Sequence, residues 1–155
     1  CPYPFKRIIS PKLLEWCVAS KRFYFIKDTS CDIENIKEKL AVVKGSDLKL
    51  FNANTSTLLE SLELGASGYS GVMANFHPEL YVKLCKEYNK KEARRIADFL
   101  TVVYPVNAKY YQRMIGNFSS IMTRTKSPAE LNATGVSEIH QLIRITEDFE
   151  TSLNV

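Results

Sequence analysis

A lysine stands at the end of an apolar run near the start of this 155-residue chain. Residues 23–26 are aromatic or aliphatic, Lys27 follows them, and Asp28 opens a polar turn. Such a run is typical of a buried β-strand, so we expect the Lys27 amine to lie among apolar walls. Partial burial favours the free amine, which attacks ketones. The pattern predicts imine chemistry at Lys27, although a surface lysine that merely ends a strand is the commoner case.

The bulk composition is that of a globular protein, with 45% hydrophobic and 25% charged residues and a formal charge of +4. The basic residues stand beside acidic ones or crowd one helix without interleaved aromatic residues, which argues against a nucleic-acid site. No stretch approaches the ~20 apolar residues that span a bilayer. The four cysteines form no CxxC pair and the chain has two histidines, so neither zinc nor a dense disulfide framework is indicated. We expect reduced thiols and a cytoplasmic location.

Strand and helix patterns alternate along the first half of the chain. The expected strands are residues 23–26, 48–52 and 68–72, and helices are expected at 11–20, 33–43, 55–64 and from Pro78 onward. A strand followed by a helix every twenty-odd residues predicts a parallel βα array. Pro105 is expected to kink or end a helix, a last helix is expected from about Val136, and Ser127-Pro128 marks a break. Trp16 and the aromatic residues of the first helix and strand are predicted to be core.

Three parallel strands cannot cover both faces and both edges of a sheet by themselves. A (β/α)₈ barrel needs roughly 250 residues, so its last strands and trailing helices would have about this length. The chain also opens on Cys1 rather than Met, which suggests a fragment of a longer parent. These features fit part of a barrel, with barrel βα units in residues 1–88 and a C-terminal helical extension in residues 89–155.

Three motifs occur in an order and spacing that resemble the dihydrodipicolinate synthase/N-acetylneuraminate lyase family. They are Cys1-Pro2-Tyr3-Pro4-Phe5-Lys6-Arg7, Phe25-Ile26-Lys27-Asp28-Thr29-Ser30 and Gly65-Ala66-Ser67-Gly68-Tyr69-Ser70-Gly71-Val72-Met73-Ala74-Asn75. The resemblance covers the whole chain but only the C-terminal half of a family member. It implies a TIM barrel whose sixth-strand lysine, here Lys27, forms an imine with pyruvate or a related 2-oxo acid.

The resemblance also implies the remaining site residues. Arg7 is nearest to the family's carboxylate-binding arginine and Lys6 is its neighbour, while a solvated loop is the alternative reading for both. Ser70 and Gly71 match the family's eighth strand, which lines the site, although small residues there equally indicate tight packing. Asn52, Asn54 and Thr55 could bind a polar substrate through hydrogen bonds, and a structural role as turn formers and helix cap is the alternative reading. The family's sialic-acid lyases carry an acidic pair after the seventh strand, whereas residues 52–56 of this chain contain no carboxylate, which argues against N-acetylneuraminate.

The resemblance implies a class I lyase or aldolase that needs no metal or organic cofactor. Its partners would be a small 2-oxo acid and an aldehyde, with no nucleic acid and no membrane, and the full-length protein would be a tetramer or dimer. The family's oxo-acid-binding loop and its proton-relaying tyrosine are not among these residues, so the fragment alone is expected to be inactive. Alternatives are a non-catalytic barrel fragment acting in assembly or ligand binding, and, more weakly, a phosphate-binding barrel.

Overall fold

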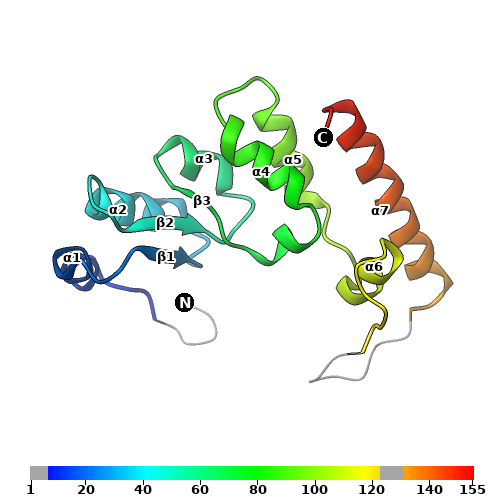
Figure 1. Ribbon diagram of the computed structural model, residues 1–155, viewed down its shortest axis with the longest axis horizontal. Helices are drawn as coiled ribbons and strands as arrows, with labels where there is room; N and C mark the ends of the chain where they lie inside the picture. The colour runs from blue at the N-terminus through cyan, green and yellow to red at the C-terminus, as the bar shows by residue number, and fades with distance from the viewer. Residues whose placement is uncertain (1–6, 123–130) are drawn as a thin grey trace. The chain divides into compact units, whose positions relative to one another are not determined.

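The structure is a computed structural model that describes residues 7–122 and 131–155 (Figure 1). Its residues fall into two compact units, Cys1–Val102 and Val103–Val155. The first unit holds a parallel sheet of three strands in the order β1 (Phe25–Asp28), β2 (Lys49–Asn52) and β3 (Gly68–Tyr69). The helices α2 (Ile33–Val43) and α3 (Leu58–Glu63) connect successive strands. The predicted parallel βα array is therefore confirmed.

Side-chain caps begin the first two helices where the sequence predicts. The helix α1 (Pro11–Ser20) starts after Ser10, whose hydroxyl accepts a hydrogen bond from the Leu13 amide at 3.2 Å. The carboxylate of Asp32 accepts hydrogen bonds from the amides of residues 34 and 35 at the start of α2. Such caps satisfy amide groups that have no partner within the helix. Local sequence thus fixes both helix starts.

The core of the barrel units lies between the helices and one face of the sheet. Its fully or largely buried members are Leu14, Ile36, Leu40, Val43, Leu48 and Leu50, and Ile9, Cys17, Val18, Ile26 and Ile33 pack against them. A second set of buried leucines and isoleucines joins α3 to α4 (Pro78–Glu87) and α5 (Ala93–Val102). Burial of these apolar stripes is the main favourable term that holds the helices against the strands.

The strand boundaries differ from those expected. The strand β1 runs two residues later than residues 23–26, because its ladder with β2 is fixed by the Lys49 amide bonding the Tyr24 carbonyl and the Ala53 amide bonding the Asp28 carbonyl, both at 2.9 Å. Lys27 is consequently a strand residue and does not follow the strand. The strand β3 ends at Tyr69, and a 3₁₀ turn, Val72–Asn75, follows it.

The helix α3 starts later than expected because side chains bond the loop before it. The Asn54 carboxamide oxygen accepts hydrogen bonds from the Thr57 amide at 3.1 Å and from the Thr57 hydroxyl at 3.2 Å. Asparagine side chains bonded in this way stabilise a turn in competition with a helix. Leu58, and not residue 55, is therefore the first residue of α3.

The second unit contains α6 (Ala108–Met114) and α7 (Ala133–Ser152). The α7 helix begins three residues before the expected start, because Asn132 caps it by accepting from the Gly135 amide at 2.9 Å. The α6 helix is separated from α5 in the way that Pro105 predicts. The predicted break at Ser127-Pro128 lies outside the described residues, and the division at residue 88 stays a prediction. Within the described ranges, no helix combines the length and apolar character needed to cross a bilayer.

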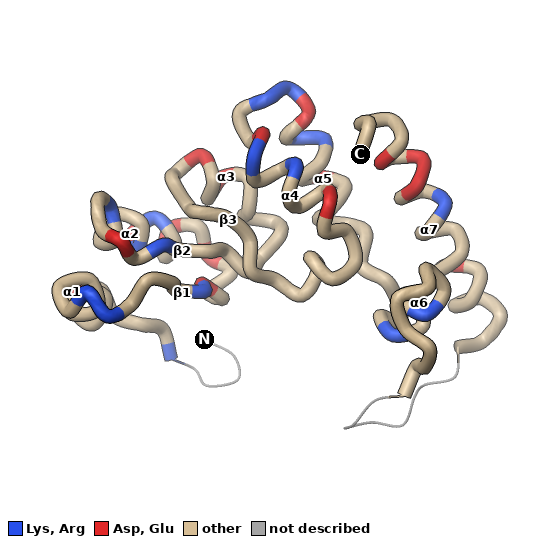
Figure 2. Tube along the Cα trace, in the orientation of Figure 1, with Lys and Arg blue, Asp and Glu red and all other residues tan. Residues whose placement is uncertain are grey.

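Positive and negative charges are mixed along the described chain. In Figure 2, Lys and Arg segments are interspersed with Asp and Glu along α2 and in the connection between α4 and α5. Examples are the ion pairs of Lys37 with Glu34 at 3.9 Å and of Lys83 with Glu87 at 3.6 Å. The Lys37–Glu34 pair is exposed and therefore contributes little to stability.

Candidate active site

Consecutive residues of β1 alternate between two faces of the sheet. Ile26 and Asp28 face the helices, whereas Phe25 and Lys27 are exposed on the other face, here called the open face. The register places Lys27 beside Phe51 of β2, and the Phe25 and Phe51 rings stack with centroids 4.7 Å apart. The open face therefore presents the Lys27 amine next to a pair of aromatic rings at the carboxyl end of its strand.

The apolar enclosure expected around Lys27 is not supplied by the described residues. Lys27 is exposed. The prediction that Trp16 and the aromatic residues of the first helix and strand are core is wrong: Trp16 is 57%, Tyr24 66% and Phe25 54% exposed. The physical reason is that the described helices cover one face of the sheet, so Phe25 is covered on the other face only by its stacking on Phe51. Apolar side chains alone do not specify burial.

A hollow of about 230 Å³ lies at the end of β1. It is lined by Ile8, Ile9, Ile26, Lys27, Asp28, Thr29, Ser30 and Lys39. The structure thus brings the segment next to Arg7 into the same hollow as Lys27, as a carboxylate-binding role for Arg7 requires. Arg7 itself is exposed. Lys6 lies outside the described residues.

Two of the residues that line this hollow, Asp28 and Lys39, form a buried ion pair. Asp28 and Lys39 are 2% and 6% exposed, and the Lys39 ammonium donates a hydrogen bond to one Asp28 carboxylate oxygen. The other oxygen accepts from the Ser30 amide at 2.8 Å and from the Ser30 hydroxyl at 2.5 Å. Burial by itself raises the pKa of Asp28, but the bonds from Lys39 and Ser30 and the Lys39 charge outweigh it and hold this pKa below its usual value.

Asn52, a predicted substrate-binding residue, lies on the helix side of the sheet. It is 0% exposed, and its amide nitrogen donates to the hydroxyls of Thr57 at 2.9 Å and Ser61 at 3.0 Å. Its carboxamide oxygen accepts from the Asn54 amide at 2.8 Å. Since its polar atoms are engaged and it faces away from Lys27, this geometry favours the structural reading of Asn52 over substrate binding.

Gly71 is enclosed by its own loop. A methyl group added there would lie 2.1 Å from the Tyr69 hydroxyl oxygen and 2.6 Å from the Ala53 carbonyl oxygen. Contacts that short are sterically forbidden, so only glycine fits. Ser70 is half-buried and its amide donates to the Asn52 carbonyl at 2.7 Å, which continues the ladder beyond β3. Tight packing therefore accounts for the small residue at position 71.

A hydroxyl network adjoins this loop. The Thr55 hydroxyl lies 3.1 Å from the Tyr69 hydroxyl and 2.7 Å from the Tyr81 hydroxyl. The two tyrosine rings stack with centroids 4.1 Å apart. Burial is the main cause that raises the pKa of Tyr81 far above its usual value, so this phenol is neutral at physiological pH. The network joins the carboxyl ends of β2 and β3 to α4.

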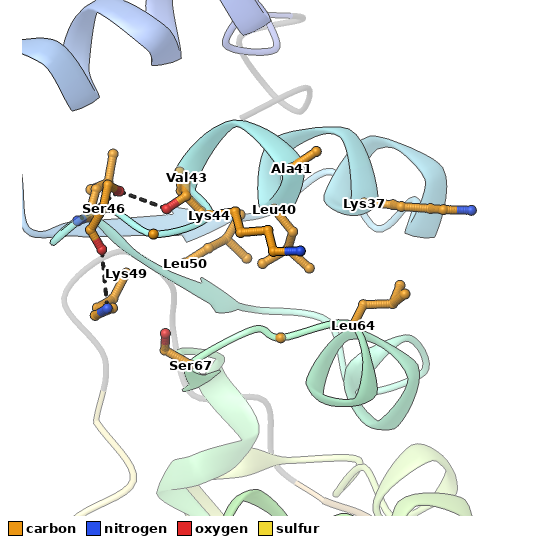
Figure 3. Close-up of a pocket in the computed structure, with 13 residues that line it drawn as sticks. Lys37, Leu40, Ala41, Val43, Lys44, Ser46, Lys49, Leu50, Leu64 and Ser67 are labelled. Atoms are coloured by element: carbon orange, nitrogen blue, oxygen red, sulfur yellow. Dashed lines mark hydrogen bonds between the residues drawn. The ribbon is translucent and has the colours of Figure 1, made fainter.

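A larger hollow, of about 410 Å³, lies at the opposite ends of the strands (Figure 3). Its lining includes Lys37, Lys44 and Lys49 together with Leu40, Leu50 and Leu64. The Lys49 ammonium already donates to the Ser46 carbonyl at 3.2 Å. Chemistry on parallel βα barrels occurs at the carboxyl ends of strands, so we place the candidate site in the smaller hollow that contains Lys27. In the described residues, no group of three or more His, Cys, Asp or Glu side chains could hold a metal ion.

Two features of the site were missed from the sequence. Lys39 lies on the apolar stripe of α2 between Ile36 and Val43, so its position on the helix was a readable signal of burial. The association of Thr55 with Tyr69 and Tyr81 had no such signal. Tyr69 and Tyr81 follow Thr55 by 14 and 26 positions along the chain, and only the packing of α4 against β3 brings the three residues together.

Comparison with known proteins defines the class first by fold. A monomeric dihydrodipicolinate synthase variant superposes with a TM-score of 0.81 at 18% identity, covering 94% of this chain and 53% of the other. The dihydrodipicolinate synthase of Thermotoga maritima gives 0.74 at 20% identity, covering 88% and 50%. A prophage protein of the same family from E. coli K12, solved in complex with pyruvate, gives 0.75 at 19%, covering 95% and 54%. The chain therefore has the fold of part of a (β/α)₈ barrel.

Sequence comparison then identifies the family. Residues 8–134 match the profile of the Dihydrodipicolinate synthetase family, and the chain belongs to that family. The chain spans about half the length of the solved structures that it matches. No match was found among curated proteins. The family resemblance noted from the three motifs is thus confirmed.

Proposed function

We propose that the protein containing this chain is an imine-forming lyase or aldolase that acts on pyruvate or a related 2-oxo acid, with Lys27 as its nucleophile. The observation that carries the proposal is the position of Lys27. It lies at the carboxyl end of a barrel strand, in the hollow of about 230 Å³, within a chain of the Dihydrodipicolinate synthetase family. The pyruvate complex of the E. coli family member supports the choice of substrate class. The activity belongs to the whole protein.

The proposed reaction begins with the neutral Lys27 amine attacking the ketone carbon. The resulting carbinolamine loses water to give an iminium ion, whose positive nitrogen withdraws electrons from the neighbouring carbon. Loss of a proton or of an aldehyde from that carbon leaves an enamine. The enamine then adds to an aldehyde in the synthetic direction, or is protonated and hydrolysed in the cleavage direction. The guanidinium of Arg7 holds the substrate carboxylate, and Lys6 is a second candidate for that role.

A second candidate function is a non-catalytic barrel that acts in assembly or ligand binding. The exposure of Lys27 favours this candidate, because the described residues do not enclose the amine together with a substrate. The first proposal therefore requires that parts of the protein beyond the described residues enclose the open face. Phe25 and Phe51 already supply one apolar wall beside Lys27.

Borohydride reduction in the presence of pyruvate tests the first proposal. In the full-length protein, the peptide that contains Lys27 should gain the mass of the reduced pyruvate adduct, as measured by mass spectrometry. The variant Lys27→Arg should not be modified, since a guanidinium does not form the imine. The variant Lys49→Arg is a matched control, because Lys49 is exposed on the same open face one strand away, and it should leave labelling at Lys27 unchanged. An unmodified Lys27 peptide in the wild-type protein would favour the non-catalytic barrel.

Assembly and location complete the proposal. We propose a dimer or tetramer of the full-length protein, which sedimentation of that protein measures directly. A cytoplasmic location is supported by the cysteines, because Cys17, Cys31 and Cys85 are free thiols in the described part of the chain. Free thiols persist most readily in a reducing compartment.

A further inference from the structure

The ion pair of Asp28 with Lys39 joins the strand that carries Lys27 to the helix behind it. Asp28 follows Lys27 directly in β1, and Lys39 belongs to α2. Both side chains are nearly fully buried on the helix side of the sheet. Removing two charges from water is costly, and an ion pair recovers this cost only with good geometry and further hydrogen bonds. A buried pair is therefore weak evidence for stability alone, and its place in the fold needs another explanation.

The further hydrogen bonds hold the polypeptide just after Lys27. One Asp28 oxygen accepts from both the amide and the hydroxyl of Ser30, which closes a tight turn after β1. The Asp28 carbonyl accepts from the Ala53 amide at 2.9 Å, which attaches the same residue to the end of β2. The backbone next to Lys27 is thus fixed to a helix, a turn and a neighbouring strand.

Strand geometry transmits this constraint to Lys27. Successive side chains of a strand point to opposite faces, so a side chain at position 28 that is held against α2 directs the preceding side chain to the open face. A one-residue slip of β1 would exchange the two faces. It would bury Lys27 against the helices and expose Asp28.

We propose that the buried Asp28–Lys39 pair is a positioning device that holds the end of β1 in register and so directs the Lys27 amine to the open face. Asp28 and Lys39 are positioning residues here and do not take part in the chemistry. This inference rests on the proposed function in one respect, namely that the Lys27 amine reacts with the 2-oxo acid. The anchoring of β1 stands by itself and is measured separately.

The test uses a double variant in which the pair is replaced by apolar residues, Asp28→Leu with Lys39→Met. Replacing both partners of a buried pair is often neutral for stability, so this variant is expected to fold, whereas either single change would leave one buried charge unpaired. The variant Lys39→Arg keeps a positive charge opposite Asp28 and serves as the conservative control. The exposed helix residue Lys37 provides the matched surface control, Lys37→Met.

Two measurements on the full-length proteins test the positioning role of the ion pair separately from the proposed imine chemistry of Lys27. Amide hydrogen exchange of residues 25–30 should be at least tenfold faster in the double variant than in the wild type and in Lys37→Met, with Lys39→Arg restoring most of the protection. Unchanged exchange in a folded double variant would overturn the positioning role. Loss of global folding in the double variant, seen as faster exchange in every element, would likewise overturn it, because the pair would then be a general requirement of the fold.

The second measurement is the rate of pyruvate trapping at Lys27. It should fall by about 10- to 100-fold in the double variant, the scale expected when a reacting group is displaced by about 1 Å. Trapping at the wild-type rate, with faster exchange at residues 25–30, would overturn the link from the pair to the amine. Absence of trapping in the wild type would overturn the proposed function, and the exchange measurement would still decide whether the pair anchors β1.

Discussion

At the scale of single residues, two neighbours at the end of β1 have opposite environments. Lys27 is exposed beside aromatic rings, and Asp28 is 2% exposed and paired with Lys39. Lys27 is the residue proposed to react with the substrate, and Asp28 is a charged residue that folding removes from water. Substitution of Lys27 should therefore abolish imine trapping directly, whereas substitution of Asp28 should change the stability of the fold and affect trapping only through the position of β1.

The ionised Asp28 carboxylate is expected to contribute to folding stability, and this contribution is expected to be lost in acid. Its pKa is lower in the folded chain than in the unfolded one, so the contribution is fully present above the unfolded pKa of about 3.9 and is lost as the pH falls through the folded pKa. The variant Asp28→Asn should lose about 3–5 kcal/mol at pH 7, because it leaves Lys39 buried without a counter-charge.

Urea unfolding from pH 7 to pH 3 measures this contribution, and the difference between wild type and Asp28→Asn should shrink toward the acid end. Asp47→Asn is the control, since Asp47 is exposed and should change stability by no more than ~0.5 kcal/mol. A difference between wild type and Asp28→Asn that stays constant across this range would contradict the expectation.

The close packing around Gly71 predicts that substitution there has a steric effect that involves no charge. The variant Gly71→Ala should destabilise the protein by about 3 kcal/mol, the upper end for overpacking, because the added methyl group would overlap the Tyr69 hydroxyl and the Ala53 carbonyl. Ser70→Ala is the matched control one residue away and should stay within ~0.5 kcal/mol. Thermal unfolding of both variants is the measurement, and equal midpoints for the two would show that the loop can relax.

At the scale of elements, the parallel βα order and the starts of α1 and α2 could be predicted because their signals are local. Ser10 and Asp32 cap the helices that they precede, and apolar periodicity marks the helices themselves. The ends of β1 and β3 could not be predicted in the same way. They depend on which residues of neighbouring strands face each other, and a period of two gives no register by itself.

The cap of α2 gives a prediction at this scale. The variant Asp32→Ala removes the acceptor for the amides of Glu34 and Asn35, and it should cost about 1 kcal/mol. Because α2 also carries Lys39, fraying of its first turn should leave the Asp28–Lys39 pair in place, as that pair lies two turns further along. Chemical denaturation gives the free-energy change, and Asp32→Asn should restore most of it. A loss above ~3 kcal/mol would mean that the whole helix depends on this cap.

At the scale of the molecule, the chain forms two compact units and spans about half the length of the dihydrodipicolinate synthases that it matches. The first unit leaves one face of its sheet open, with Phe25 54% exposed there. An open aromatic face beside a candidate nucleophile indicates that the described residues supply one wall of a site and not the whole of it.

This arrangement predicts that residues 1–155 alone are inactive. Steady-state assays of the isolated polypeptide with pyruvate should show no turnover, because Lys27 is exposed and the described residues do not enclose it. The full-length protein is the positive control. Pyruvate-dependent turnover by the isolated polypeptide would contradict the expectation.

The sequence by itself determined the family, the parallel βα order and Lys27 as the candidate nucleophile, because motifs, caps and apolar periodicity are carried by residues close together in the chain. Only the tertiary structure decided that Asn52 is bonded within the scaffold, that position 71 admits only glycine, and that Asp28 is paired with Lys39. Those outcomes depend on strand register and on helix packing, which bring together side chains that lie far apart in the sequence.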